Sequence, residues 1–449
     1  MQRATAHYLS REMAILGVVD FALCFILIDT MLQAAGVSVS LPPLADMLPR
    51  SDLALAGILT LIVGGIALPA GLYRPEVCRR CQPLLIGIGA AALVAFGVVS
   101  LLRDGPDGLI ADVRSLYGAE VLTAWLAAMA LIRLLHGRLA GRTAATRRVL
   151  LFGAPRQVGA VTTRLRSPRG RRFDAVLLPN QAMTWETLRH QQLWAIVMAS
   201  EPTAQAAEAL LDCKFRGIRV LSGAAFQERY LRRIDLEALT AHDLLVSRGI
   251  TASRISATVK RLCDLIIGAA MLVLLLPLMA VTAVAVKLDS PGPVLYRQVR
   301  TGRYDRTYTL YKFRSMTQDA EASGDPRWAQ KQDPRVTRVG RFIRATRIDE
   351  LPQLVNVMRG NMSLVGPRPE RPHFVEQLAR AIPFYRQRAY VKPGLTGWAQ
   401  VNFPYGASVE DAREKLAYDL YYVKNRSFAL DLRILVSTVR VVLFREGAR

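Results

Sequence analysis

The chain has 449 residues, of which 51% are hydrophobic, and 59 lysines and arginines against 36 aspartates and glutamates give it a net charge of +23. A chain both this apolar and this basic must keep its apolar residues in separate segments, which predicts membrane helices beside soluble domains, and its length suits about three domains. The basic residues are spread without a nucleic-acid-binding motif, so we expect lipid and phosphate partners and no nucleic acid. Five cysteines are too few and too scattered for a disulfide framework.

Residues 1–140 contain four apolar runs, each about long enough to cross the roughly 30 Å hydrocarbon core of a bilayer. The runs lie near 13–35, 53–73, 84–102 and 121–136. Arginines cluster before the first run and after the second and fourth, so the positive-inside rule places both ends of this predicted four-helix transmembrane bundle in the cytoplasm. Asp20 and Asp29 in the first run either mark a pathway or face partner helices, and we favour the second interpretation.

Residues 147–245 are predicted to form a Rossmann-like α/β domain. Short apolar strands alternate with helices, which is typical of a parallel sheet covered by helices. The strands are expected at 149–153, 174–178, 195–199 and 217–221, a helix at 202–215 and a linker at 231–245. The stretch from Gly153 to Gly159 is a degraded dinucleotide-binding fingerprint, because Pro155 replaces the middle glycine. We therefore favour a packing or dimerisation role for this domain over nucleotide binding.

The apolar run at 265–288 has two interpretations. Its length suits a fifth transmembrane helix. However, basic residues flank both of its sides, with Lys260 and Arg261 before it and Lys287 at its end, and a span would place one basic flank outside the cell. Pro277 lies at the centre of the run, where a proline breaks or kinks a helix. These features favour a re-entrant helix-hairpin that enters and leaves the membrane on the cytoplasmic face.

Two adjacent carboxylates, Asp349 and Glu350, come just before Pro352 and an apolar repeat of helical spacing. Proline is favoured in a first helical turn, so the pattern predicts a helix with both carboxylates at its N-terminus. The helix dipole favours their ionised forms, as a nucleophile or metal ligand needs. Three upstream arginines could hold phosphate oxygens: Arg341, Arg344 and Arg347. The alternative for this motif alone is ordinary helix capping.

Four further segments surround this pair. They are 311–316 (Tyr-Lys-Phe-Arg-Ser-Met), 333–340 (Asp-Pro-Arg-Val-Thr-Arg-Val-Gly), 356–370 (Asn-Val-Met-Arg-Gly-Asn-Met-Ser-Leu-Val-Gly-Pro-Arg-Pro-Glu) and 391–402 (Val-Lys-Pro-Gly-Leu-Thr-Gly-Trp-Ala-Gln-Val-Asn). In this order, the region from Lys260 to the C-terminus resembles the bacterial sugar transferase family, the polyprenyl-phosphate hexose-1-phosphate transferases or monotopic phosphoglycosyl transferases. The resemblance to its larger members implies a transmembrane bundle at 1–140, a Rossmann-like domain at 147–245 and an α/β monotopic catalytic domain at 254–449, with the re-entrant helix at 265–288.

The resemblance implies transfer of a sugar-1-phosphate from a UDP-sugar to undecaprenyl phosphate, with release of UMP. Asp349 would attack the β-phosphorus to form a phosphosugar-aspartate, and Glu350 would help hold a metal ion. Oxygen ligands and a phosphate substrate indicate Mg²⁺, with Asp349 and Glu350 as its protein ligands. Such an enzyme starts exopolysaccharide, O-antigen or capsule assembly on the cytoplasmic face of the bacterial inner membrane, with the lipid bilayer as a partner. The sugar and a possible homodimer stay open.

The other candidate site residues are mostly cationic. The expected substrate contacts are Lys312, Arg314, Arg335, Arg344 and Arg368, with Pro367 and Pro369 as a rigid wall for the nucleotide. A surface salt bridge is the alternative for each cation. Lys260 and Arg261 are expected at lipid headgroups. The C-terminal stretch at 428–444 suits an amphipathic membrane-surface helix or a core helix. Two other function classes, a polytopic transporter and a membrane-anchored nucleotide sensor, do not account for the Asp349–Glu350 motif.

Overall fold

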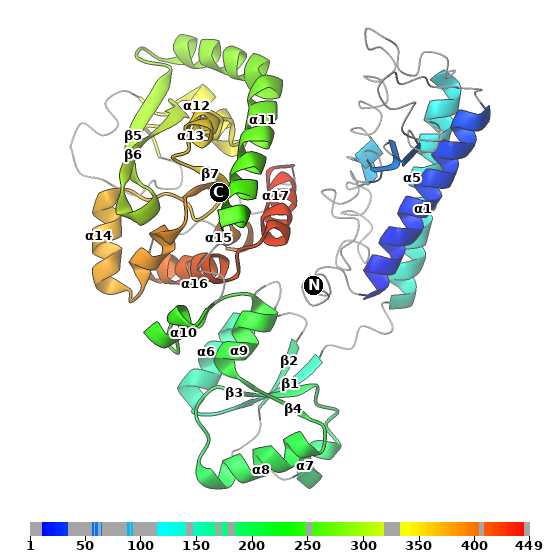
Figure 1. Cartoon of the computed structure of the whole chain (residues 1–449), viewed down its shortest axis with the longest axis vertical. Coiled ribbons are helices and arrows are strands. Elements are labelled where there is room, and N and C mark those ends of the chain that lie inside the picture. The colour runs from blue at the N-terminus through cyan, green and yellow to red at the C-terminus, as the bar shows by residue number, and fades with distance from the viewer. Residues whose placement is uncertain are drawn as a thin grey trace. The chain divides into compact units, whose positions relative to one another are not determined.

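The computed structural model describes residues 11–34, 115–140, 147–165, 173–177, 185–247, 254–317, 333–403 and 408–443, together with isolated residues between 56 and 92 and at 167 and 170. The chain divides into two compact units, Met1–Ala145 and Thr146–Arg449. Each unit is described by itself below, and Figure 1 shows the elements of both.

In the first unit, helices α1 (Arg11–Ala34) and α5 (Ser115–Ala140) pack side by side (Figure 1). A buried ion pair joins them: Arg133 Nη1 donates to Asp20 Oδ1 at 3.0 Å, and its Nη2 also donates to this carboxylate. Trp125 Nε1 donates to the Asp20 carbonyl at 3.4 Å. Asp20 therefore faces a partner helix, as we favoured from the sequence. The second and third apolar runs, 53–73 and 84–102, lie almost entirely outside the described residues.

The second unit begins with a four-stranded parallel sheet of order β2-β1-β3-β4, which confirms the strand pattern predicted from the sequence. The strands are β1 (Arg147–Phe152), β2 (Phe173–Leu177), β3 (Ala195–Met198) and β4 (Arg219–Ser222). Helices α6 (Pro155–Leu165) and α9 (Gly223–Phe226) cover one face, and α7 (Trp185–Arg189) and α8 (Ala204–Phe215) cover the other (Figure 1). Alternate residues of β1 enter the two apolar clusters, as the strand period of two requires.

The turn after β1 is tightly closed. Gly153 has φ +142°, and a side-chain carbon at this position would lie 2.7 Å from Ser200 Oγ. The same hydroxyl accepts a hydrogen bond from Ala154 N at 3.3 Å. In a parallel sheet of this kind a dinucleotide binds at the carboxyl ends of the strands, where the strand order reverses. Ser200, just after β3, instead fills the space beside Gly153, which fits the packing role that we favoured.

The segment after the sheet packs against residues 254–449 and is not a loose linker. We call residues 254–449 the catalytic domain after the role that the family resemblance implies for them. A π-helical turn (Gln227–Leu231) leads into it, and Ile234 is buried in the catalytic core. Ile234 N donates to the Ala417 carbonyl at 2.9 Å, and Trp398 Nε1 donates to the Arg232 carbonyl at 3.0 Å. Arg233 forms a two-pronged ion pair with Glu414. A short helix, α10 (Ala241–Leu245), follows. The middle domain is thus joined to the catalytic domain by buried contacts.

Helix α11 (Arg254–Asp289) is long and apolar enough to cross a membrane, with a mean hydropathy of 2.6 over its most apolar window, of which 11% is buried. Pro277 lies inside it, and Figure 1 shows that the helix turns sharply before it reaches β5. Both ends are fastened to the same domain: Asp264 Oδ1 accepts from Leu364 N at 3.2 Å, and Asp289 Oδ2 accepts from Val339 N at 3.1 Å. The middle of the helix exposes a row of large apolar side chains: Ile266, Val273, Leu274, Val281 and Val284.

The catalytic domain surrounds one large apolar cluster. An antiparallel hairpin of β5 (Leu295–Thr301) and β6 (Thr307–Phe313) follows α11, and the parallel pair β7 (Ser363–Val365) and β8 (Gly394–Thr396) lies deeper. The α-helices are α12 (Arg338–Ala345), α13 (Gln353–Arg359), α14 (Pro372–Ala381), α15 (Trp398–Asn402), α16 (Val409–Asn425) and α17 (Phe428–Leu443). Helix α17 buries Leu430 and Ile434 and exposes Phe428 and Leu432, so it combines a core face with an apolar outer face.

The ion pair between α1 and α5 gives a first prediction. The Asp20→Asn variant should leave the Arg133 guanidinium buried without its counter-charge and lower the free energy of unfolding by about 3–5 kcal/mol. Asp29→Asn is the matched control, because Asp29 only accepts a hydrogen bond from Gln33 on an exposed face, and should cost less than about 0.5 kcal/mol. Unfolding of the purified protein in detergent, followed by circular dichroism, measures both. Equal stability of the two variants would contradict the assignment.

Candidate active site

Asp349 and Glu350 lie in a 3-10 turn (Ile348–Glu350) directly before α13, and only 7% of each residue's surface is exposed. Arg347 precedes the turn in the left-handed conformation with φ +62°, which reverses the chain after α12. Pro352 then caps α13. The prediction of a helix start at this motif is therefore correct to within one turn. The conformation directs two neighbouring carboxylates into the interior of the domain.

Glu350 is surrounded by cations. Its Oε1 accepts a hydrogen bond from Arg368 Nη2 at 2.7 Å and from Lys312 Nζ at 3.1 Å, and Arg347 Nη1 lies 3.5 Å away. Burial by itself opposes ionisation, but Arg368 and Lys312 outweigh it and hold the pKa of Glu350 well below its usual value. Glu350 is thus a permanent anion that fixes the positions of Lys312 and Arg368.

Asp349 has a weaker electrostatic environment. Its Oδ2 lies 3.9 Å from Lys312 Nζ, beyond hydrogen-bond distance. Burial raises the pKa of Asp349; Lys312 opposes this rise, and the neighbouring Glu350 charge adds to it. Two adjacent carboxylates whose environments push their pKa values apart are typical of a catalytic pair with separate roles. Asp349 is therefore the more basic carboxylate of the two.

Lys312 is held on β6 by an asparagine that the sequence analysis missed. Asn356 is fully buried on α13; its Oδ1 accepts from Tyr311 N at 3.1 Å, and its Nδ2 donates to the Thr309 carbonyl at 2.7 Å. These two hydrogen bonds fasten the free edge of β6 to α13, the helix that follows the carboxylates. The Lys312 side chain is partly buried; burial lowers its pKa, although Glu350 opposes this shift. An asparagine within an apolar helical repeat was the one available sequence signal.

Two predicted phosphate contacts, Arg314 and Arg335, bind other groups of the protein. Arg314 Nη2 donates to the Val286 and Ser290 carbonyls at 3.1 and 2.5 Å and so caps the end of α11. Arg335 pairs with Asp333 through hydrogen bonds of 2.8 and 2.6 Å, which lower the pKa of that carboxyl to about 2. Arg344 is half-buried on α12 and acts on the same Asp333 charge. These contacts have structural roles that explain Arg314 and Arg335 without a substrate.

The three residues predicted to lie at or in the membrane are all on α11: Lys260, Arg261 and Pro277. Lys260 Nζ donates to Asp431 Oδ2 on α17 at 2.7 Å, and Arg261 donates to the Val357 and Met358 carbonyls at 2.7 and 2.8 Å. Both cations thus fasten the start of α11 to the catalytic domain. Pro277 lies inside the exposed apolar part of the helix.

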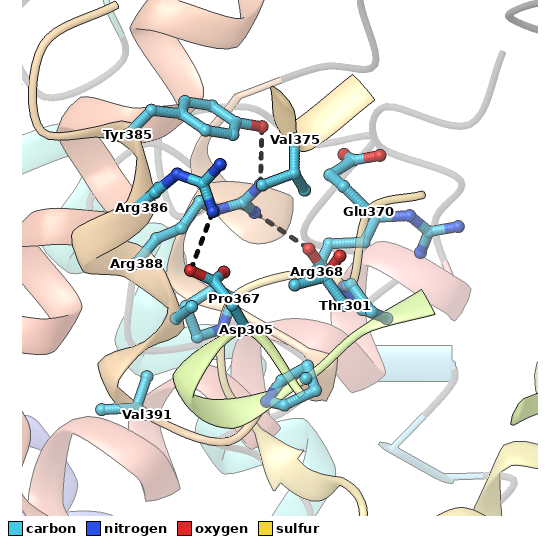
Figure 2. Close-up of a pocket in the computed structure, with 14 residues that line it drawn as sticks. Thr301, Asp305, Pro367, Arg368, Glu370, Val375, Tyr385, Arg386, Arg388 and Val391 are labelled. Carbon is cyan, nitrogen blue, oxygen red and sulfur yellow. Dashed lines mark hydrogen bonds and ion pairs between the residues drawn. The ribbon is translucent and has the colours of Figure 1, made fainter. Parts of the chain in front are cut away.

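A surface pocket lies beside Arg368 (Figure 2). Pro367, Arg368 and Pro369 all line it, so the structure brings the proline-flanked arginine to a pocket wall. Arg368 also reaches Glu350, which places this pocket next to the carboxylate pair. Across the pocket, Arg386 Nη1 donates to Asp305 Oδ2 at 3.1 Å (Figure 2).

Arg388 lines the pocket, holds the neighbouring wall in place and was not predicted from the sequence. Its Nη2 donates to the Arg368 carbonyl at 2.9 Å and pairs with Asp419 Oδ2 at 2.7 Å, while Nη1 donates to Tyr385 Oη at 2.8 Å (Figure 2 shows the first and last of these). Asp419 is 2% exposed on α16. A chain of contacts thus runs from α16 through Arg388 to Arg368. A lone aspartate in the apolar run of α16 was the sequence signal that could have found it.

A further cation, Arg300, lies beside the pocket wall. Arg300 Nη1 donates to the Pro369 carbonyl at 3.1 Å and lies 3.7 Å from Glu370. Burial lowers the pKa of Arg300; Glu370 opposes this, and the Arg368 charge adds to it. The buried hydroxyl of Tyr308 has no hydrogen-bond partner among the described residues. A cationic site with an unused hydroxyl suits a substrate with several phosphate oxygens.

Comparison with known proteins places this site in a family. A family model described as bacterial sugar transferase matches residues 255–445. Over 191 residues the chain is 44% identical to the UDP-glucose:undecaprenyl-phosphate glucose-1-phosphate transferase of Caulobacter vibrioides, a match that covers 42% of this chain and 71% of that protein. The chain belongs to the bacterial sugar transferase family.

Two other members differ in their named sugar. The chain is 45% identical over 240 residues to the UDP-N-acetylgalactosamine-undecaprenyl-phosphate N-acetylgalactosaminephosphotransferase of Aeromonas hydrophila, which covers 54% of this chain and 56% of that protein. It is 44% identical over 194 residues to the undecaprenyl-phosphate glucose phosphotransferase of Komagataeibacter xylinus, which covers 42% of this chain and 36% of that protein. The chain thus matches 56% of the length of the Aeromonas protein and 36% of the length of the Komagataeibacter protein.

The buried pair of Arg388 and Asp419 gives a second prediction. Arg388→Met leaves the Asp419 carboxylate buried and unpaired, and we expect a loss of about 3–5 kcal/mol in the free energy of unfolding. Burial already raises the pKa of Asp419, and loss of Arg388 raises it further, so the loss in stability should shrink as pH falls and the carboxyl takes up a proton. Urea unfolding at several pH values tests this.

Arg413→Met is the control for that experiment, because Arg413 is exposed on the same helix as Asp419. It should change the free energy of unfolding by less than about 0.5 kcal/mol at every pH. A destabilisation of Arg388→Met that does not vary with pH would mean that the Asp419 charge is not what Arg388 balances.

Proposed function

We propose that the chain transfers a sugar-1-phosphate from a UDP-sugar to undecaprenyl phosphate and releases UMP. The observation that carries this proposal is the buried Asp349–Glu350 pair, in which Lys312 and Arg368 balance the Glu350 charge and leave the Asp349 carboxylate without a hydrogen bond from either. The family members above are named as transferases or phosphotransferases that act on undecaprenyl phosphate, and two of the names include a UDP-sugar. These names support the reaction class.

The reaction proceeds in two displacements. A carboxylate oxygen of Asp349 attacks the phosphorus that carries the sugar, the bond from that phosphorus to the bridging oxygen breaks, and UMP leaves with the electron pair. An oxygen of undecaprenyl phosphate then attacks the phosphosugar-aspartate, and the bond between Asp349 and phosphorus breaks, which restores the carboxylate. Covalent catalysis of this kind splits one difficult transfer between two anions into two easier steps.

The surrounding cations make the approach of two anions possible. Lys312 and Arg368 converge on Glu350, and Arg300 lies behind the pocket wall formed by Pro369. A diphosphate in the pocket would receive donors that are already fixed in place, so little reorganisation is needed as charge develops on the leaving phosphate. Pro367 and Pro369 form the rigid wall against which the nucleotide lies.

The carboxylate pair fits a Mg²⁺ ion in its donor chemistry. Mg²⁺ in phosphoryl-transfer sites is held by one or two carboxylates and completes its shell with water and substrate phosphate oxygens. Asp349 and Glu350 are adjacent, buried oxygen donors and would supply those protein ligands. Bound Mg²⁺ supplies neutralisation of the diphosphate charge. Removal of Mg²⁺ with EDTA should therefore abolish UMP release.

The two ends of α11 support the membrane arrangement that we propose. Both ends are hydrogen-bonded to one catalytic domain, and the apolar middle with Pro277 is exposed between them. These features support a re-entrant helix that enters the bilayer and returns on the same, cytoplasmic face of the inner membrane. A site on this face meets a soluble UDP-sugar and the head of a membrane-embedded lipid together. The product would start the assembly of an exopolysaccharide, O-antigen or capsule.

The reaction gives a third prediction. Asp349→Asn should lower UMP release from a UDP-sugar in the presence of undecaprenyl phosphate and Mg²⁺ on the order of 10³-fold or more, because no carboxylate oxygen is left to attack. UDP-glucose, UDP-galactose and UDP-N-acetylgalactosamine should each be assayed, since the named relatives use different sugars. Glu376→Gln, an exposed change on α14, should retain the wild-type rate. A near wild-type rate in Asp349→Asn, or no UMP from the unmodified chain with any sugar, would refute the proposal.

The fourth prediction concerns pH. Asp349 must be ionised to attack, and its pKa is raised by burial and opposed by Lys312. Activity should therefore fall as pH decreases through this raised pKa, and Lys312→Met should move the acid limb of the kcat/KM profile to higher pH because the lysine no longer lowers the pKa. Lys214→Met, at an exposed position on α8, serves as the control. An acid limb that stays in place or moves to lower pH would contradict the role of Lys312.

The fifth prediction concerns topology. In a chain without its native cysteines, single cysteines at Ser256, near the start of α11, and at the exposed Thr307 of β6 should both resist a membrane-impermeant reagent in intact cells. Both should react once the cells are opened, because a re-entrant helix keeps its two ends on one face. Labelling of only the Thr307 site in intact cells would show that α11 crosses the membrane.

A further inference from the structure

Lys392 lies at an unusual concentration of positive charge. A side-chain carbon on Gly360 would lie 3.3 Å from Arg261 Nη2 and 3.6 Å from Lys392 Nζ, so the two cationic groups converge on the same point. Within the described part of the chain, the Lys392 ammonium forms no ion pair with a carboxylate. Burial lowers the pKa of Lys392, and the charges of Arg261, Arg303 and Lys260 lower it further against the opposing effect of Asp264.

The nearby groups do not explain this arrangement. Arg261 by itself satisfies the Val357 and Met358 carbonyls at the end of α13. Lys260 is paired with Asp431, and Asp264 accepts a hydrogen bond from Leu364 N. Asp264 supplies one negative charge near Lys392, so the two cations Arg261 and Lys392 together exceed it. Two converging cations of this kind are typical of a phosphate site.

The surroundings of the cluster indicate where the phosphate comes from. On α11, the neighbours of Arg261 include Val259 and Leu262, which are 49% and 56% exposed. Two residues before Lys392 is Tyr390, which is exposed and whose ring centroid lies 6.4 Å from that of the exposed Tyr304. Exposed apolar side chains on a membrane helix, followed by tyrosines and then cations, are typical of the interface between the hydrocarbon core and the headgroups.

The chain direction separates this cluster from the nucleotide pocket. Val391 and Pro393, the residues on either side of Lys392, both line the pocket, and Val391 is extended. In an extended segment successive side chains point to opposite sides, so Lys392 points away from the pocket and toward α11. The Pro367 carbonyl accepts from Gly394 N at 2.9 Å, which fastens this segment to the pocket wall.

We propose that Lys392 and Arg261 form a binding site for the phosphate headgroup of a membrane lipid, back to back with the nucleotide pocket across the 391–393 segment. Two lipids carry such a phosphate at this interface. One is the lipid acceptor of the reaction, undecaprenyl phosphate, and for this lipid alone the inference rests on the proposed function. The other is an anionic phospholipid of the bilayer. In either case the lipid phosphate accepts hydrogen bonds from the two cations and relieves their mutual repulsion.

Native mass spectrometry of the full-length protein in a neutral detergent tests the site without reference to activity. Undecaprenyl phosphate and phosphatidylglycerol are titrated separately against the unmodified chain, Lys392→Gln and Lys392→Arg. We expect Lys392→Gln to weaken binding of one lipid about tenfold, since a charge-assisted hydrogen bond to phosphate is lost, and Lys392→Arg to restore it. The lipid that responds is the ligand. Arg380→Gln, an exposed change on α14, should leave the affinity for both lipids unchanged.

A second measurement separates this inference from the proposed function. UMP released from a UDP-sugar in the first turnover, before any lipid acceptor is added, should be the same for Lys392→Gln and the unmodified chain. If undecaprenyl phosphate is the ligand, the KM for it should rise about tenfold in Lys392→Gln, in line with its binding. Unchanged affinity of Lys392→Gln for both lipids would overturn the site even if the transferase reaction is confirmed. If the unmodified chain releases no UMP but Lys392→Gln still weakens lipid binding, the proposed function is wrong and the lipid site is supported.

Discussion

The buried contact between Glu350 and the two cations Lys312 and Arg368 is the interaction on which the site depends. A carboxylate that is 7% exposed is stable as an anion only when its partners supply both charge and hydrogen bonds, and Glu350 receives both. The same contact leaves Lys312 3.9 Å from Asp349, close enough to favour its ionised form and too far for a hydrogen bond. Lys312 thereby opposes the effect of burial on the Asp349 carboxylate without donating a hydrogen bond to it.

Each partner of Glu350 is in turn fixed by a different part of the chain. Lys312 is set by the hydrogen bonds of Asn356 to β6, and Arg368 by the contact of its carbonyl with Arg388, which α16 holds through Asp419. Helix α16 also carries the contacts to the segment that follows the Rossmann-like sheet, such as the hydrogen bond between Ile234 and Ala417. The middle domain is thus connected by packed, hydrogen-bonded contacts to the helix that supports the pocket wall.

Local patterns predicted the elements and the central pair, and long-range contacts account for what they missed. The strands of the parallel sheet and the helix start at the Asp349–Glu350 motif follow from apolar period and proline position. The partners of Arg314 and Arg335 did not follow, because an arginine in a motif looks the same whether it caps a helix, as Arg314 does, or binds a phosphate. Arg388 and Asp419 were missed because they are 31 residues apart and meet only in the folded chain.

The central claim is that Asp349 becomes covalently bound to the sugar phosphate. The most direct measurement is peptide mapping by mass spectrometry after the protein is mixed with a UDP-sugar and Mg²⁺ without lipid acceptor and quenched in acid. The account predicts one sugar phosphate on the peptide that contains Asp349, with one UMP released for each modified chain, and loss of the modification when undecaprenyl phosphate is added before the quench. An unmodified Asp349 in a chain that releases UMP once the acceptor is present would show a direct displacement and contradict the account.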